Sequence, residues 1–268
     1  SLIRPLTAEK RPWEMLFYGI LISSVALFLS FWIFRDEADI VAVFFTVFAC
    51  VPLMFHAIRN EEKKDLYIEE ESTLLKEHGK VISFFIFLFL GLVVSFSLWY
   101  VFLPAEISQD LFGLQLSTID NINAPAGAAS SVGFFSKIFM NNIKVLAFST
   151  LFAFFYGTGA IFILTWNATV IAAAIGSLAL SLSTNNPLML SGGFAFSRYL
   201  FHGLPEMMGY MVGGLAGGII SVAIINNHFR TERFQKIMYD AGILILAACV
   251  ILAVAAAMEA FLVPAMFL

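Results

Sequence analysis

Charged residues are scarce in this chain. Only 13% of its 268 residues are charged, whereas 60% are hydrophobic and the mean hydropathy is +0.89. A soluble domain has about a quarter charged residues, so the composition excludes an ordinary soluble domain. Apolar blocks of about 18 residues or longer recur along the sequence, which is the signal of transmembrane helices. We therefore predict an all-α fold, a polytopic transmembrane helix bundle.

Cysteine, histidine and catalytic motifs are also scarce. Cys50 and Cys249 both stand inside apolar blocks, which indicates small buried hydrophobes rather than a disulfide framework or a CxxC metal site. The sequence contains no HExxH, GxSxG or P-loop motif. A net charge of −4 lacks the excess of positive charge that is typical of nucleic-acid binding. These absences predict a chain that is not an enzyme and has no cofactor, no metal site and no nucleic-acid partner.

Seven membrane spans account for the apolar blocks, at 13–34, 38–58, 81–103, 137–164, 170–183, 206–225 and 238–262. The first two are joined by RDEAD, so residues 1–58 form an N-terminal transmembrane hairpin. A polar turn, TWNAT, separates the fourth span from the fifth. The rest, 81–268, is the membrane core, in which 104–136 is expected to be an external loop. Segment 184–205 combines Asn-Pro and Gly-Gly with an apolar middle, so it is either an interfacial helix or a re-entrant segment.

The distribution of basic residues predicts the orientation of these spans. Most of the 15 basic residues precede the first span or lie between spans two and three or six and seven: Arg4, Lys10, Arg11, Arg59, Lys63, Lys64, Lys76, Lys80, Arg230, Arg233 and Lys236. The positive-inside rule then places the N-terminus in the cytoplasm and the C-terminus outside, in a multi-pass cell-membrane protein. The charged stretch 59–80 becomes a cytoplasmic linker helix, either a solvated connector or a site for a cytosolic partner. The acidic loop 104–136 is either solvated or a docking surface for an extracytoplasmic partner.

Small residues recur at helical spacing in the sixth span, as GxxxG repeated on two adjoining rows: Gly209, Gly213, Gly214, Gly217 and Gly218. In lipid, small residues favour helix association because they allow close backbone approach. The pattern predicts tight packing against another helix. That helix belongs either to the same chain or to a second subunit, which would make the protein a homodimer.

Polar residues of three segments are expected at similar depth, in the outer half of the bilayer. They are Asn141, Asn142 and Lys144 in the fourth span, Arg198, His202 and Glu206 around the start of the sixth, and Glu259 near the end of the seventh. Charges inside a bilayer normally pair or face a cavity, and here two bases balance two acids. Pro205 suits the first turn of the sixth helix, and Pro264 follows the seventh.

This predicted cluster has two main interpretations. It is a hydrogen-bonded network that fixes helix register, or a site for an ion, a lipid head group or a small polar solute. Metal ligation by His202 and Glu206 is disfavoured, because Gly203 and Pro205 argue against a continuous helix between them.

Three ordered motifs resemble a known family. Asn141-Asn142-Ile143 opens a membrane helix, His202-Gly203-x-Pro205-Glu206 precedes the glycine-rich helix, and Glu259-Ala260-Phe261-x-x-Pro264 closes the chain. Together, over roughly 80–268, they resemble the stage II sporulation protein M family of prokaryotic integral membrane proteins. The resemblance implies a non-enzymatic membrane component. In spore-forming members it would act in engulfment with cell-wall hydrolases, although many relatives occur in organisms that form no spores. The hairpin at 13–58 is additional to the usual pattern.

Taken together, the residues predict a non-catalytic integral membrane protein, a homodimeric scaffold or complex subunit surrounded by the lipid bilayer. The alternative is a channel or transporter for an ion or small polar solute. In that case the polar cluster would line the pathway, and 184–205 would be a broken helix of the kind found near transporter binding sites.

Overall fold

The structure is a computed structural model that describes residues 11–67, 71–123, 131–153, 158–225, 232–263 and 266. Its helices are, in chain order, α2 (Glu14–Ile33), the short η1 (Arg35–Glu37), α3 (Ala38–Tyr67), α4 (Glu71–Phe102), α5 (Ala105–Asn123), α6 (Ser131–Ala153), α7 (Thr158–Ser183), α8 (Leu188–Ile225), α9 (Glu232–Ala257) and the π-helix η3 (Met258–Leu262). Six segments within α2, α3, α4, α7, α8 and α9 are long and apolar enough to cross a membrane. The predicted all-α polytopic bundle is confirmed.

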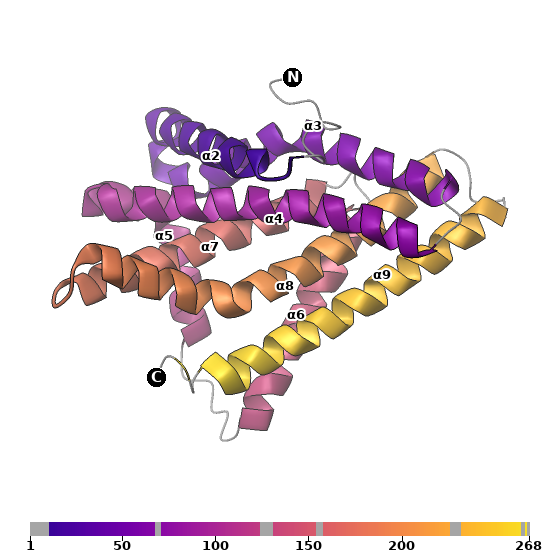
Figure 1. The fold of residues 1–268 in the computed structure, drawn as a ribbon. Helices are drawn as coiled ribbons and strands as arrows, with labels where there is room; N and C mark the ends of the chain where they lie inside the picture. The colour runs from indigo at the N-terminus through magenta and orange to yellow at the C-terminus, as the bar shows by residue number, and fades with distance from the viewer. Residues whose placement is uncertain are drawn as a thin grey trace.

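Helix α8 occupies the centre of the bundle. It contacts α3, α4, α6, α7 and α9, and Figure 1 shows it crossing the molecule between α4 and α9. Helices α7 and α8 run antiparallel, since Gly203 faces Ile171 and Gly214 faces Ala160. Because α8 touches so many neighbours, residues placed on its different faces are brought against different helices.

The N-terminal hairpin packs through α2 onto α4. A Cβ atom on Gly19 would lie 2.7 Å from the Leu88 carbonyl oxygen, and one on Gly91 would collide with the backbone of Leu16. One glycine on each helix therefore lets the two backbones touch, as small residues do in membrane helix pairs.

The charged stretch 59–80 does not form one helix. Its first part continues α3 to Tyr67 and its last part belongs to α4, which begins at Glu71; residues 68–70 lie outside the described structure. Nδ1 of His78 lies 2.6 Å from a carboxylate oxygen of Glu61, and Lys64 donates to the other oxygen at 2.6 Å. A continuous helix would separate positions 61 and 78 by about 25 Å, so the chain must reverse between them.

The expected loop 104–136 contains the whole of helix α5 and the start of α6. Leu111 and Phe112 are buried in the core, and the Arg35 guanidinium binds Asp110 at 3.1 Å. The backbone N–H of Leu114 also donates to Asp39 at 2.9 Å. The two apolar side chains anchor α5 in the core, and the two polar contacts tie it to the turn between α2 and α3. Residues 124–130 lie outside the description.

The predicted turn TWNAT is wrong, because it lies inside the continuous helix α7. Nδ2 of Asn167 donates to the Ile163 carbonyl at 2.8 Å, and Oγ1 of Thr169 donates to the Trp166 carbonyl at 2.7 Å. Polar side chains that bond their own helix in this way need no turn. The predicted fourth span instead divides into α6 and the first part of α7, around the undescribed residues 154–157. Helix α6 is not among the six candidate spans.

Segment 184–205 continues directly into the predicted sixth span. Helix α8 runs without a break from Leu188 through Pro205 to Ile225, over 38 residues or about 57 Å. The expectation that Gly203 and Pro205 interrupt the helix is therefore wrong. Proline removes one backbone donor, and packing on several sides compensates for that loss in membrane helices.

Candidate functional site

Three polar side chains, Asn142, Glu206 and Tyr210, meet between α6 and α8. A fourth, Glu259 of η3, lies near enough to interact with them electrostatically. We call these four residues the Glu206 cluster. The Tyr210 hydroxyl donates to Oε1 of Glu206 at 2.6 Å. Because that hydroxyl has one hydrogen, the nitrogen of the Asn142 amide, rather than its oxygen, faces the tyrosine. In this orientation Nδ2 of Asn142 donates to Oη of Tyr210 at 3.2 Å and to Oε1 of Glu206 at 3.1 Å.

The spacing of residues along α8 explains how the cluster forms. Glu206 and Tyr210 are four residues apart, so they lie one above the other on the same helix face. The same face continues with Gly213 and Gly217, where a Cβ atom would collide with Leu146 and with the backbone of Thr150. The two glycines therefore bring α6 close enough for its Asn142 to reach the carboxylate.

Helix α6 is bonded to the backbone of α8 as well. Oγ of Ser149 donates to the carbonyl oxygen of Tyr210 at 3.3 Å, and Oγ1 of Thr150 donates to that of Gly213 at 3.2 Å. Both residues follow Asn142 on the α8-facing side of α6. The pairing advances in the same direction on both helices, so α6 and the second half of α8 run parallel.

Glu259 comes from the π-helix that closes α9. It interacts electrostatically with Glu206 and with Tyr210, and its neighbour Phe261 stacks on Phe135 of α6 at 6.3 Å between ring centroids. Single π-helical turns inside α-helices are rare and occur frequently at functional sites. No sequence pattern predicts this π-helical turn.

The other predicted members are not all brought into the cluster. Asn141 and Lys144 are exposed on α6, away from α8, and Arg198 is half-buried on α8. Among the residues that the structure describes, no ion pair joins Lys144 or Arg198 to either glutamate. The predicted charge balance is therefore not formed by these residues.

Two predicted residues lie partly or wholly outside the description. His202 belongs to the backbone of α8, one turn before Glu206, but its side chain is not described. Pro264 is outside the described residues. Within the part of the chain that is described, no group of three or more His, Cys, Asp or Glu side chains could hold a metal ion.

The depth of the cluster in the bilayer stays a prediction. Glu206 lies one turn from the start of the candidate span Gly203–Ile225, and Glu259 lies one turn from the end of the candidate span Phe234–Leu262. Gly203 faces Ile171, the middle residue of the candidate span Gly159–Ser183 in α7. Bilayer depth matters because unpaired charges cost most at the centre.

Each glycine of the two predicted rows packs against a helix of the same chain. A Cβ atom on Gly209 would lie 2.7 Å from Leu252 of α9, one on Gly214 would lie 2.7 Å from Ala160 of α7, and one on Gly218 would lie 2.6 Å from Ile58 of α3. Gly213 and Gly217 face α6, as described above. The rows are filled within the chain, so they give no argument for a second subunit.

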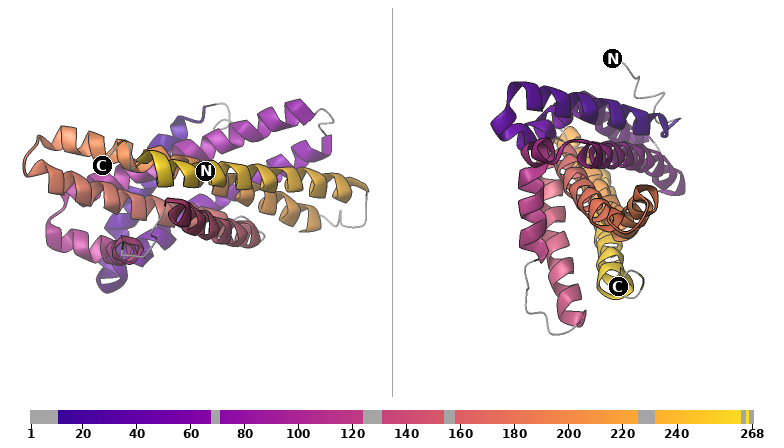
Figure 2. Two further views of the ribbon diagram at one scale, coloured as in Figure 1. Left: turned by 90° about the horizontal axis from the view of Figure 1, so that it is seen from below. Right: turned by 90° about the vertical axis from the view of Figure 1, so that its left-hand side faces the viewer.

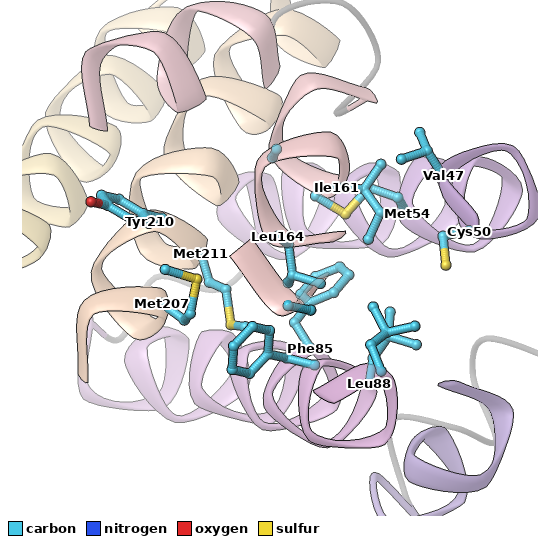
Figure 3. Close-up of a cluster of buried hydrophobic side chains, with 14 of the residues drawn as sticks. Val47, Cys50, Met54, Phe85, Leu88, Ile161, Leu164, Met207, Tyr210 and Met211 are labelled. Carbon is cyan, nitrogen blue, oxygen red and sulfur yellow. The ribbon is translucent and has the colours of Figure 1, made fainter. Parts of the chain in front are cut away.

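A small apolar void lies on the other side of α8. Its volume is about 10 Å³, and its lining is Met54, Phe85, Ala160, Ile161, Leu164, Met207, Tyr210 and Met211. Figure 3 shows the Tyr210 hydroxyl pointing away from these apolar side chains. A void of this size holds at most about one water molecule, and water requires polar partners that this lining does not offer. The void is therefore a packing gap rather than a ligand site.

Tyr210 is the member of the cluster that sequence reasoning missed. It stands in an apolar block of a chain that is rich in aromatic residues. The available signal was its position four residues after Glu206, since a hydroxyl one turn from a buried carboxyl can donate to it.

The comparison with known proteins identifies one family. The model of that family, stage II sporulation protein M, matches residues 81–264. No curated protein and no solved structure matches the chain. The matched segment includes α6, α8 and η3, hence every residue of the Glu206 cluster, whereas α2 and α3 lie outside it. Because the match extends over well more than half of the sequence, the chain belongs to the stage II sporulation protein M family.

Proposed function

We propose that this chain is a non-catalytic membrane subunit in which the Glu206 cluster holds α6, α8 and η3 in a fixed arrangement. The observation that carries the proposal is the bonding of Asn142. This side chain is only 2% exposed, and its amide nitrogen donates to both Tyr210 and Glu206 across the helix interface. A polar group that is buried and fully occupied by neighbouring side chains is typical of a network that fixes helix register.

Replacement of Glu206 tests this role. Glu206→Ala leaves the Tyr210 hydroxyl without its acceptor, which costs about 1–3 kcal/mol, and removes one of the acceptors of the Asn142 amide. Glu206→Gln keeps an acceptor oxygen, so its loss of stability is smaller. Thermal unfolding in mild detergent should rank the wild type above Glu206→Gln and Glu206→Ala lowest. Glu106→Gln, at an exposed acid on α5, is the matched control and should leave stability unchanged.

A second function, binding of a proton or cation within the membrane, is favoured by a specific observation. Glu206 and Glu259 interact with each other, and no base pairs with them among the described side chains. Pro205 and the π-helix also place an irregularity beside each acid. Irregular helices around acidic residues inside the membrane are a feature of transporter sites.

The same variants distinguish the two functions. If Glu206 and Glu259 bind a cation, purified wild-type protein is stabilised by sodium or potassium in a concentration-dependent manner, and Glu206→Gln keeps its fold but loses that response. If the cluster is structural, the variants lose stability to the same extent at every cation concentration. A Glu206→Gln protein as stable as the wild type, with no cation response in either, would contradict both functions.

The homodimer stays a prediction. Its main argument was the pair of glycine rows, and these are filled by α3, α6, α7 and α9 of the same chain. Size-exclusion chromatography with light scattering in several mild detergents measures the oligomeric state directly. A monomer in all of them would remove the dimer from the proposal and leave the role of the Glu206 cluster intact.

A further inference from the structure

The side of α6 that faces away from α8 carries positive charge. We call it the α6 outer face, and its exposed residues are Phe134, Ser136, Lys137, Met140, Asn141, Lys144, Ala147, Phe148 and Leu151. Lys137, Asn141 and Lys144 are spaced by four and three residues, so they form one stripe along the helix. In both views of Figure 2, α6 (pink) lies at the outside of the bundle, so this stripe points outward.

The outward faces of α9 and α2 are apolar. The exposed positions of α9 include Leu246, Val250 and Val254, and those of α2 include Phe17 and Phe28. These are the side chains expected where a helix meets lipid chains. A helix face with two lysines and an asparagine differs from both, so lipid chains alone are not its natural neighbour.

The stripe reaches the level of the membrane-spanning part of α8. Asn142 lies beside Tyr210, and Thr150 lies beside Gly213. Lys144 stands between these two positions of α6, hence level with the candidate span Gly203–Ile225. Lys137 is about 10 Å nearer to the beginning of α6. Lys137 is therefore nearer to the start of α6, and Lys144 is nearer to the interior of the bilayer.

Neither lysine is neutralised by the part of the chain that the structure describes, where Lys137 and Lys144 make no ion pair. A second copy docked through this same face would not neutralise them, because a two-fold interface brings identical surfaces together and the α6 outer face carries no acidic residue. The occupant that complements the face must carry negative charge, and the lysine stems and flanking apolar side chains require that it also carry hydrocarbon.

We propose that the α6 outer face binds the head group of an anionic phospholipid. Lys137 and Lys144 would pair with the phosphate and the Asn141 amide would donate a hydrogen bond to it. Phe134, Met140 and Phe148 would contact the acyl chains. Lysines at membrane helices attract anionic lipids, and their flexible stems reach towards the head-group layer. This lipid site is separate from the Glu206 cluster, which lies on the opposite side of α6.

Native mass spectrometry of the full chain tests the proposal, with phosphatidylglycerol titrated against phosphatidylcholine. The wild type should retain phosphatidylglycerol in preference. The variant Lys137→Gln/Lys144→Gln should bind it about tenfold more weakly or worse. The control Arg59→Gln/Lys76→Gln removes the same charge from exposed positions of α3 and α4, and should retain the wild-type preference.

Two further measurements complete the test. Lys137→Arg/Lys144→Arg keeps the charges and should bind phosphatidylglycerol like the wild type, even if the glutamine variant folds poorly. Equal retention of both lipids by the wild type, or equal losses in the glutamine variant and the control, would overturn the proposal. A change of oligomeric state in the glutamine variant without loss of lipid would overturn it in favour of an interface between copies.

Discussion

Gly217→Ala tests the closest approach of two helices in the bundle. The three atoms nearest to an added Cβ all belong to the backbone of Thr150, with its carbonyl carbon at 3.0 Å and its Cα at 3.1 Å and the carbonyl oxygen nearer still. Backbone atoms cannot turn aside as a flexible side chain does. Helices α6 and α8 must therefore move apart by more than about 0.4 Å, and a gap of 0.5–1 Å forfeits about a quarter to a half of each dispersion contact along the interface.

Overpacking of this kind costs about 1–3 kcal/mol. The matched control is Gly193→Ala in the same helix, where an added Cβ would meet nothing within 4 Å. Since alanine favours a helix over glycine by up to about 1 kcal/mol, the control should be as stable as the wild type or more stable.

Thermal unfolding in mild detergent, followed by tryptophan fluorescence, measures both variants. At about 2–4 °C per kcal/mol, Gly217→Ala should unfold roughly 2–12 °C below the wild type, and Gly193→Ala should not. Equal stability of the two variants would refute the packing of α6 on α8. A shift of Gly217→Ala from dimer to monomer with no change in unfolding temperature would instead assign the glycine rows to a second subunit.

Three other substitutions have expected outcomes. Tyr210→Phe removes a hydroxyl bonded at 2.6 Å and should lower the unfolding free energy in detergent by about 0.6–1.7 kcal/mol; a more stable variant would contradict the bond. Gly91→Ala pushes α2 off α4 at Leu16 and should increase protease cleavage of the N-terminal hairpin; unchanged cleavage would refute that contact. Arg35→Gln breaks an exposed ion pair with Asp110 and should cost less than about 1 kcal/mol, a difference that shrinks as salt is added; a larger loss that salt does not reduce would argue against this account.

Part of the fold was predictable because it depends on composition over long windows. The apolar blocks predict the helices of the hairpin and of α4, α8 and α9. Single residues that usually interrupt helices were less informative about where the helices begin and end. TWNAT contains two threonines and an asparagine, yet Asn167 and Thr169 bond the helix carbonyls, so a polar run that satisfies itself is compatible with a continuous helix. Pro205 was misleading for a similar reason, since neighbouring helices support the chain around it.

The composition of the candidate site was only partly predictable, because it depends on the direction in which each side chain points around its helix axis. Successive residues of an α-helix are about 100° apart. Asn142 faces α8, so Lys144 lies about 200° from it and cannot reach the same neighbour. Sequence reasoning placed both at similar depth, which is correct along the axis but ignores direction around it. The proximity of Glu259 to Glu206 was predictable from depth alone, because α8 and η3 both pack against α6.

The reciprocal glycine contact between α2 and α4 has a consequence for biosynthesis. The two helices run side by side in the same direction, since Gly19 lies against Leu88 and, further along both helices, Ser24 is hydrogen-bonded to Ser95 and Trp99. The intervening helix α3 must therefore run back in the opposite direction. When a ribosome has completed α2 at Ile33, the last residue of α4, Phe102, is still 69 codons away. At about 5–20 residues per second this interval lasts roughly 3–14 s. During that time the surface of α2 at Gly19 is not covered by α4. The insertion machinery or a neighbouring lipid must cover it until α4 has been synthesised.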